Sequence, residues 1–174
     1  MAEFWIPDES SGEIITAPQL EAAPVREAFE RWRNLKGTKP FPETPDIVMA
    51  PVSANIILVK VLGAGEDYQY LRVGEALVAG FGEDFSGQCL SEIEQTNPRF
   101  GIGLRMLYEM VRASGEPLCY RGWAGQDMPG AKFVYYESAV LPFGQTDGVD
   151  HILVISMLVL RDGLRPDAPD SLRL

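Results

Sequence analysis

Residues 68–93, YQYLRVGEALVAGFGEDFSGQCLSEI, contain four glycines and decide the fold. Glycine-rich turns after a strand hold phosphate in many nucleotide-binding proteins. A Walker-type loop needs Lys and then Ser or Thr directly after its last glycine, and a dinucleotide fingerprint needs GxGxxG between a strand and a helix. Neither pattern occurs in this stretch. We therefore expect its glycines to supply positive φ angles and to separate short helices.

Strands are predicted on both sides of this stretch. Upstream, the β-branched and apolar residues 55–63 and the alternating residues 67–73 form a hairpin around a glycine-containing turn. Downstream, an Asn-Pro pair begins a long helix at 98–114. Three further strands are predicted at 116–125, 131–143 and 149–160. Five strands with helices after the second predict an α+β fold, in which an antiparallel sheet carries helices on one face.

An amphipathic helix is predicted before the sheet, at residues 24–36, because PVREAFERWRNLK places apolar side chains at helical spacing with charges between them. The last strand is apolar on both faces over residues 151–160, so both faces of the sheet must be covered. Helix 24–36, packed in cis or swapped from a second subunit, is the candidate for the second face. Its predicted contact residues are Phe29, Trp32 and Leu35.

The chain is expected to form one domain, since 174 residues with 46% hydrophobic and 23% charged content are ordinary for a single globular domain. Residues 1–23 mix proline, serine and acids without a sustained period and predict an N-terminal arm. The domain then spans residues 24–162. Residues 163–174 are rich in proline and polar residues and predict a C-terminal tail.

Charge and hydropathy narrow the partners and the location. A net charge of −10, from 25 acidic and 15 basic residues, repels a nucleic-acid backbone and an anionic membrane surface. The most apolar run, 151–160, has about half the length that a helix needs to span a bilayer. The N-terminal residues lack the pattern of a signal peptide. We expect a cytoplasmic protein that binds neither nucleic acid nor membranes.

A loose pattern of aromatic, small and apolar residues surrounds the glycines. It consists of Tyr70, Val73, Gly74, Leu77, Val78, Phe81 and Gly82, then Glu83, Asp84, Phe85, Ser86 and Gly87, with Leu90 and Ile93 as the next apolar anchors. Together with ERWRNLKG at 30–37, YRG at 120–122 and LPFG at 141–144, the pattern resembles a PAS domain over roughly residues 25–162. It is similar, more narrowly, to a group of stand-alone bacterial PAS-like proteins of largely unassigned function.

The resemblance implies a five-stranded PAS-like sheet and a non-enzymatic sensory, signalling or protein-interaction module. It also implies a homodimer that forms through the sheet surface, a signalling protein as partner, and a small ligand in a cavity between the sheet and the long helix. Two alternatives stay open. One is a small cavity enzyme of isomerase or hydrolase type, and the other is an apolar-ligand carrier whose pocket is lined by Met106, Met110 and Phe133.

Polar and aromatic residues gather in the third and fourth predicted strands: Tyr120, Arg121, Trp123, Tyr135, Tyr136 and Glu137. Alternation puts Arg121 and Trp123 on one face and Tyr120 on the other. An arginine beside aromatic rings suits a carboxylate or planar ligand. In one interpretation the ligand contacts are Arg121, Trp123, Tyr136, Met106 and Met110. In the other, which we favour, this is an outer sheet face on which the N-terminal helix or a second subunit packs.

No catalytic or metal-binding residue is predicted. The one histidine, His151, begins the last strand, where an edge or cap role is commoner than catalysis. Haem-binding PAS domains usually take an axial histidine from the long helix, and residues 98–114 contain none, so the resemblance disfavours haem. It disfavours flavin as well, because Cys89 lacks the flanking residues that mark flavin-binding light sensors. Cys89 is predicted to be a structural thiol.

Overall fold

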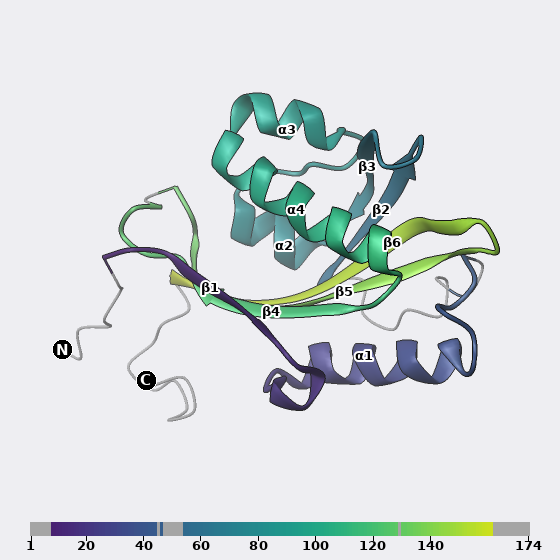
Figure 1. Cartoon of the computed structure of the whole chain (residues 1–174). Helices are drawn as coiled ribbons and strands as arrows, with labels where there is room; N and C mark the ends of the chain where they lie inside the picture. The colour runs from purple at the N-terminus through teal and green to yellow at the C-terminus, as the bar shows by residue number, and fades with distance from the viewer. Residues whose placement is uncertain (1–7, 45, 47–53, 129, 162–174) are drawn as a thin grey trace.

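The computed structural model describes residues 8–44, 46, 54–128 and 130–161, which form an open six-stranded sheet with helices on both faces (Figure 1). The strand order is β1-β4-β5-β6-β2-β3, and all neighbouring strands are antiparallel. The fold class is α+β, as predicted. The predicted tail, 163–174, and residues 1–7 of the predicted arm lie outside the described residues.

The elements follow the predicted order closely. The strands are β1 (Ser11–Ile15), β2 (Ile56–Leu62), β3 (Asp67–Val73), β4 (Leu118–Trp123), β5 (Phe133–Gln145) and β6 (Gly148–Leu160). The helices are α1 (Ala23–Lys36), α2 (Glu75–Phe81), α3 (Leu90–Thr96) and α4 (Pro98–Ser114), and a short 3-10 helix, η1, spans Ala17–Gln19.

The prediction of five strands is wrong, because β1 adds a sixth. This strand lies within the segment that was predicted to be an arm, and it pairs with β4 from Ser11 opposite Trp123 to Ile15 opposite Cys119. Four of its five residues are exposed. The strand therefore lacks the alternation of apolar and polar residues by which a half-buried strand is recognised in a sequence.

The prediction that the glycines of the opening stretch have positive φ angles and separate short helices is confirmed for Gly82 and Gly87 and is wrong for Gly80, which lies inside α2. Gly82 ends α2 with a φ of 78°, and its N–H donates to Val78 O at 2.8 Å. Gly80 has a different reason: a Cβ at this position would lie 2.2 Å from Cδ1 of Leu158 on β6. The absence of a side chain at Gly80 thus lets α2 pack directly on the sheet.

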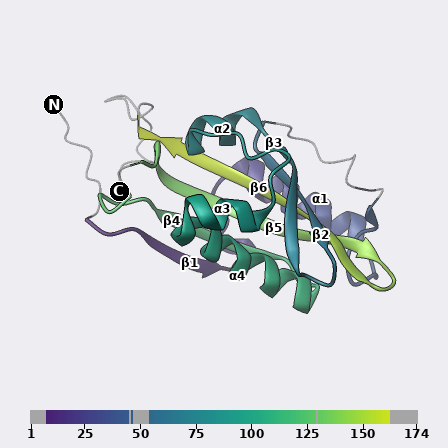
Figure 2. The ribbon, with the colours of Figure 1, turned by 90° about the horizontal axis from the view of Figure 1, so that it is seen from above.

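The two faces of the sheet are covered by different helices. Helices α2, α3 and α4 lie over one face, and α1 lies over the other (Figures 1 and 2). Each face has its own buried cluster. Val59, Ile152 and Val154 belong to the cluster under α2, α3 and α4, whereas Leu153 and Ile155 belong to the cluster under α1. β6 is thus buried on both faces along its middle, as its apolar sequence predicted.

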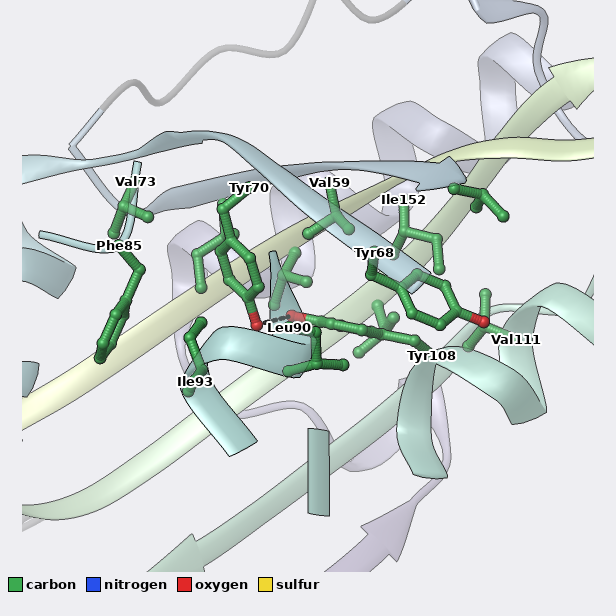
Figure 3. Packing of buried hydrophobic residues seen from close by; sticks show 14 of the residues in the cluster. Val59, Tyr68, Tyr70, Val73, Phe85, Leu90, Ile93, Tyr108, Val111 and Ile152 are labelled. Atoms are coloured by element: carbon green, nitrogen blue, oxygen red, sulfur yellow. Dashed lines mark hydrogen bonds between the residues drawn. The ribbon is translucent and has the colours of Figure 1, made fainter. Parts of the chain in front are cut away.

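Tyrosines fill the centre of the helix-covered side. Tyr68 and Tyr70 from β3 and Tyr108 from α4 are buried, and the ring of Tyr108 contacts the rings of the other two. The hydroxyls of Tyr70 and Tyr108 point toward one another and lie 2.9 Å apart (Figure 3). The long helix is therefore joined to the hairpin by a hydrogen bond inside an otherwise apolar cluster.

Candidate functional site

Helix α1 is docked on the sheet in cis through its apolar side. Val25, Ala28, Phe29 and Trp32 are buried in the cluster that they share with β5 and β6. Nε1 of Trp32 donates to Pro142 O at 2.8 Å, so the indole is fixed on β5 as well as buried. Of the three predicted contact residues, Phe29 and Trp32 lie in this contact, whereas Leu35 is only half-buried.

The start of α1 is held by a carboxylate from the middle of the sheet. Glu137 on β5 is 0% exposed. Its Oε1 accepts the N–H of Ala22 at 2.7 Å, and both of its oxygens lie 3.1 Å from the N–H of Glu21. Ala22 is the N-cap of α1 and offers no capping side chain of its own. Glu137 therefore pairs backbone donors that the start of a helix leaves free, where the helix dipole also favours a negative charge.

Arg121 and Trp123 lie on the α1 face, close to Glu137. Arg121 is opposite Glu137 in the β4–β5 ladder. Its Nε donates to Oε1 of Glu13 at 2.8 Å, and its guanidinium reaches Oε1 of Glu21 at 3.5 Å. Arg121 thus connects β1 and the segment that leads into α1.

Part of this face extends past α1. Trp123 and Tyr135 are half-buried and in ring contact, with centroids 4.9 Å apart. Tyr135 is opposite Val159, and Met157 is opposite Glu137, so all of these side chains share one face. We call Trp123, Tyr135, Met157 and Val159 the open patch. It borders the carboxylate that holds α1, because the Tyr135 hydroxyl lies 3.4 Å from Oε2 of Glu137.

The predicted ligand-binding residues of β4 and β5 lie on two different faces of the sheet. Tyr136 lies on the opposite face from Arg121 and Trp123, where its ring contacts those of Tyr120 and Phe133. A single cavity cannot be lined by both sets. The expectation of one ligand site that includes Arg121, Trp123 and Tyr136 is therefore corrected. Arg121 and Trp123 do share the outer face on which α1 packs, but Arg121 contacts Glu13 and Glu21, and Trp123 lies past α1 in the open patch.

Met106 and Met110 do not line the interior. They are 61% and 43% exposed, on the side of α4 that faces away from the sheet. The helix instead buries Tyr108 and Val111. Residues 102, 106 and 110 form one row along the helix, while residues 104, 108 and 111 form another row on the opposite side. Both rows are apolar, so the sequence did not distinguish them.

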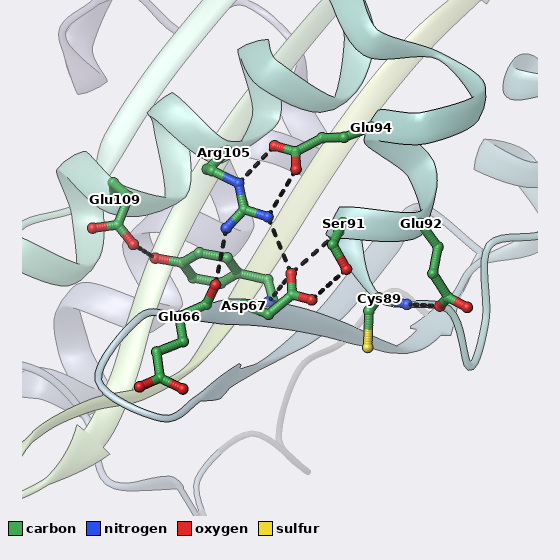
Figure 4. Close-up of polar contacts among 9 residues, drawn as sticks. Glu66, Asp67, Cys89, Ser91, Glu92, Glu94, Arg105 and Glu109 are labelled. Carbon is green, nitrogen blue, oxygen red and sulfur yellow. Dashed lines mark hydrogen bonds and ion pairs between the residues drawn. The ribbon is translucent and has the colours of Figure 1, made fainter.

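A polar cluster joins α3 and α4 to the start of β3 (Figure 4). Arg105 on α4 binds Glu94 on α3 through Nε at 2.6 Å, and it binds Asp67 on β3 through a second nitrogen at 3.1 Å. Ser91 donates to the same aspartate at 2.6 Å.

Cys89 lies next to this cluster. Burial, with Asp67 and Glu92 close by, raises the pKa of the Cys89 thiol. A raised pKa favours the protonated thiol over the reactive thiolate.

His151 makes a local polar contact at the start of β6. Its Nδ1 lies 2.8 Å from Oδ1 of Asp150, which also accepts a hydrogen bond from the hydroxyl of Thr44 at 2.5 Å.

Among the residues that the structure describes, no three His, Cys, Asp or Glu side chains lie close enough together to hold a metal ion. No helix within the described part of the chain is both long enough and apolar enough to cross a membrane.

The role of Glu137 has no signal in the local sequence, because its partners lie 115 and 116 residues away along the chain. The position of a charged residue, Glu137, in a strand that is otherwise buried indicates only that the residue needs hydrogen-bond donors, and not which donors these are.

Comparison with known proteins gave no match to the chain among family models, curated proteins or solved structures.

Proposed function

We propose that this protein is a non-enzymatic sensory or protein-interaction module of PAS type, in which α1 is the element that responds. The observation that carries the proposal is the docking of α1 through Glu137. Further support comes from the placement of α2, α3 and α4 after the β2–β3 hairpin, over the opposite face of the sheet. The PAS-like residues from Tyr70 to Gly87 lie in β3, in α2 and in the turn that follows.

Two kinds of contact hold α1, and they differ in how they respond to a partner. Apart from the hydrogen bond of Trp32 to Pro142 O, the apolar contact of α1 is non-directional, whereas the carboxylate of Glu137 is paired with only a few backbone donors. A partner that covers the open patch would touch Tyr135, which lies against Glu137. Binding there is thereby coupled to the start of α1. It shifts the equilibrium between docked and released helix only as far as the partner's affinities for the two states differ.

The ionisable groups around α1 are already occupied, which favours a binding role over a catalytic one. Glu137 accepts from two backbone amides, and Arg121 is paired with Glu13 and Glu21. General acid or base catalysis needs a group that is free to exchange a proton with a substrate. Output from such a module passes through another protein or through a second copy of the chain.

The first test is hydrogen exchange of the α1 amides in Glu137→Gln. The amide side chain keeps the size of the carboxylate but loses its charge and one acceptor, so exchange across residues 21–36 should rise more than exchange in β5 and β6. Glu27→Gln is the matched control, because Glu27 is exposed on the same helix. Unchanged protection of α1 in Glu137→Gln, or an equal rise in Glu27→Gln, would contradict the proposal.

The second test identifies what the module detects. Native mass spectra before and after denaturation, with an absorbance spectrum alongside, reveal any small molecule that the purified protein carries. A released molecule would make this a ligand sensor, and a protein without one would favour a protein contact at the open patch. Substrate turnover that disappears in His151→Ala would instead establish an enzyme and overturn the proposal.

A further inference from the structure

The outer edge of the sheet at β1 has free backbone groups. Backbone groups along a strand point alternately to its two neighbours. The N–H of Ala124, directly after β4, donates to β5 at 3.0 Å, so even-numbered residues of β4 bond β5 and odd-numbered residues bond β1. Glu13 lies opposite Arg121, so the odd-numbered residues of β1 bond inward. Gly12 and Ile14 therefore direct their N–H and C=O groups away from the sheet.

This edge differs from the opposite edge, where the chain itself pairs with the outward backbone of Tyr70. At β3, the N–H of Gly87 donates to Tyr70 O at 2.7 Å, and the N–H of Tyr70 donates to Gln88 O at 2.9 Å. At β1, no group among the described residues forms a hydrogen bond with the outward backbone of Gly12 or Ile14. Unpaired edge groups of this kind match one class of occupant, an extended strand.

We propose that β1 pairs antiparallel with β1 of a second copy of this chain, so that the sheet continues through both subunits. The free groups define the register. The N–H of Ser10 is taken by Oδ1 of Asp127, and that of Thr16 is taken by Oε1 of Gln19. Gly12 of each copy then lies opposite Ile14 of the other, with both N–H···O bonds exchanged in each pair.

The side chains fit this register on the helix-covered face. Ile14 is 60% exposed and lies opposite Tyr120, whose ring packs in the helix-side cluster. Gly12 shares that face, and a Cβ at Gly12 would lie 2.9 Å from the Tyr136 hydroxyl. The position opposite Ile14 thus has no side chain of its own, and Ile14 of the second copy would pack over Gly12 beside Tyr136.

The other face carries one unfavourable pair. The two copies of Glu13 would lie directly opposite one another at the twofold axis, where like charges oppose pairing. Each Glu13 is paired on its inner side with its own Arg121 at 2.8 Å, so self-recognition rests on the other two features. The free stretch of β1 complements itself in hydrogen bonds and in shape, and this selects a second copy rather than an unrelated strand. The inference goes beyond the proposed role of α1 and does not depend on it.

The association is tested by sedimentation of Ile14→Lys, Ile14→Pro and Ile102→Lys beside the parent protein. A charge or a proline at an outward edge position blocks strand pairing while leaving the inward ladder intact. We expect the dimer dissociation constant to rise by at least about tenfold in both Ile14 variants, or about 1.4 kcal/mol. Ile102→Lys is the control, because Ile102 on α4 is 63% exposed and thus closely matched to Ile14. A monomeric parent protein, or a dimer that only Ile102→Lys weakens, would overturn the proposal.

The register is tested by disulfide formation in Glu13→Cys and Ser11→Cys. At the twofold axis the Cα atoms of residue 13 would be about 4.5 Å apart, within reach of a disulfide. Residue 11 would lie opposite residue 15, so its two copies would be roughly 14 Å apart along the strands. Oxidation should therefore link Glu13→Cys into a covalent dimer and leave Ser11→Cys unlinked. Equal linkage of the two variants would contradict this register.

Discussion

At the scale of single residues, the buried hydroxyl pair of Tyr70 and Tyr108 is a contact at which the loss of one polar atom should lower stability. Both residues are buried, and each hydroxyl has the other as its hydrogen-bond partner, at 2.9 Å. Replacing either tyrosine by phenylalanine leaves the remaining hydroxyl without a partner in an apolar cluster. Each single variant should lose about 1–3 kcal/mol of unfolding free energy.

The double variant Tyr70→Phe/Tyr108→Phe should cost less than the sum of the two single variants, because it removes both polar groups together. Urea denaturation of the four proteins in this cycle gives the coupling energy directly. Additive losses would mean that the two hydroxyls do not depend on one another, contrary to the geometry.

At the scale of elements, Arg105 is expected to contribute more than any exposed ion pair on the same helix. Its side chain is 26% exposed and bridges α3 and β3, whereas that of Arg99 is 68% exposed and makes one contact with Asp127. Arg105→Met leaves Glu94 and Asp67 without their cation and should cost about 1–3 kcal/mol of stability. Arg99→Met should change stability by no more than about 0.5 kcal/mol. Similar losses in denaturant titrations of the two variants would contradict this assignment.

Elements with a strong period could be predicted from the sequence almost to the residue. Helix 98–114 corresponds to α4 (Pro98–Ser114), and strand 149–160 corresponds to β6 (Gly148–Leu160). Proline and glycine mark the ends of α4, and the long apolar run marks β6 as buried on both faces. These signals are local, because they depend on neighbouring residues in the chain and not on tertiary contacts.

Features that depend on distant contacts could not be predicted. Strand β1 is exposed along most of its length and is defined by its pairing with β4 rather than by its own pattern. The expectation that Met106 and Met110 line a pocket is wrong, because they are as apolar as the residues of α4 that do face the sheet. The function of Glu137 depends on where the chain before α1 passes, which only the folded structure reveals.

At the scale of the whole molecule, the burial of tyrosine hydroxyls and of a cysteine thiol should lower the free energy of unfolding at high pH. Burial raises the pKa of Tyr120 to about 12 and that of the Cys119 thiol to about 11. It also raises the pKa of Tyr70 and of Tyr108. In the unfolded chain, tyrosine ionises near pH 10 and cysteine near pH 8.5. Above these values the unfolded state releases protons that the folded state retains, so the free energy of unfolding falls as pH rises.

This contribution should be constant below about pH 8 and should then decline, first with Cys119 and from about pH 10 with the tyrosines. Above pH 10, each buried tyrosine lowers the free energy of unfolding by about 1.4 kcal/mol per pH unit, until the pH reaches the pKa of that tyrosine in the folded state. Denaturant titrations between neutral pH and pH 11, followed by tyrosinate absorbance, measure the slope. Tyr120→Phe should make the fall in unfolding free energy above pH 10 shallower by about 1.4 kcal/mol per pH unit. Cys119→Ala should make the fall below pH 10 shallower without abolishing it, because the pKa of the Cys89 thiol is raised as well. A slope above pH 10 that is unchanged in Tyr120→Phe would mean that this hydroxyl ionises as readily in the folded protein as in the unfolded chain.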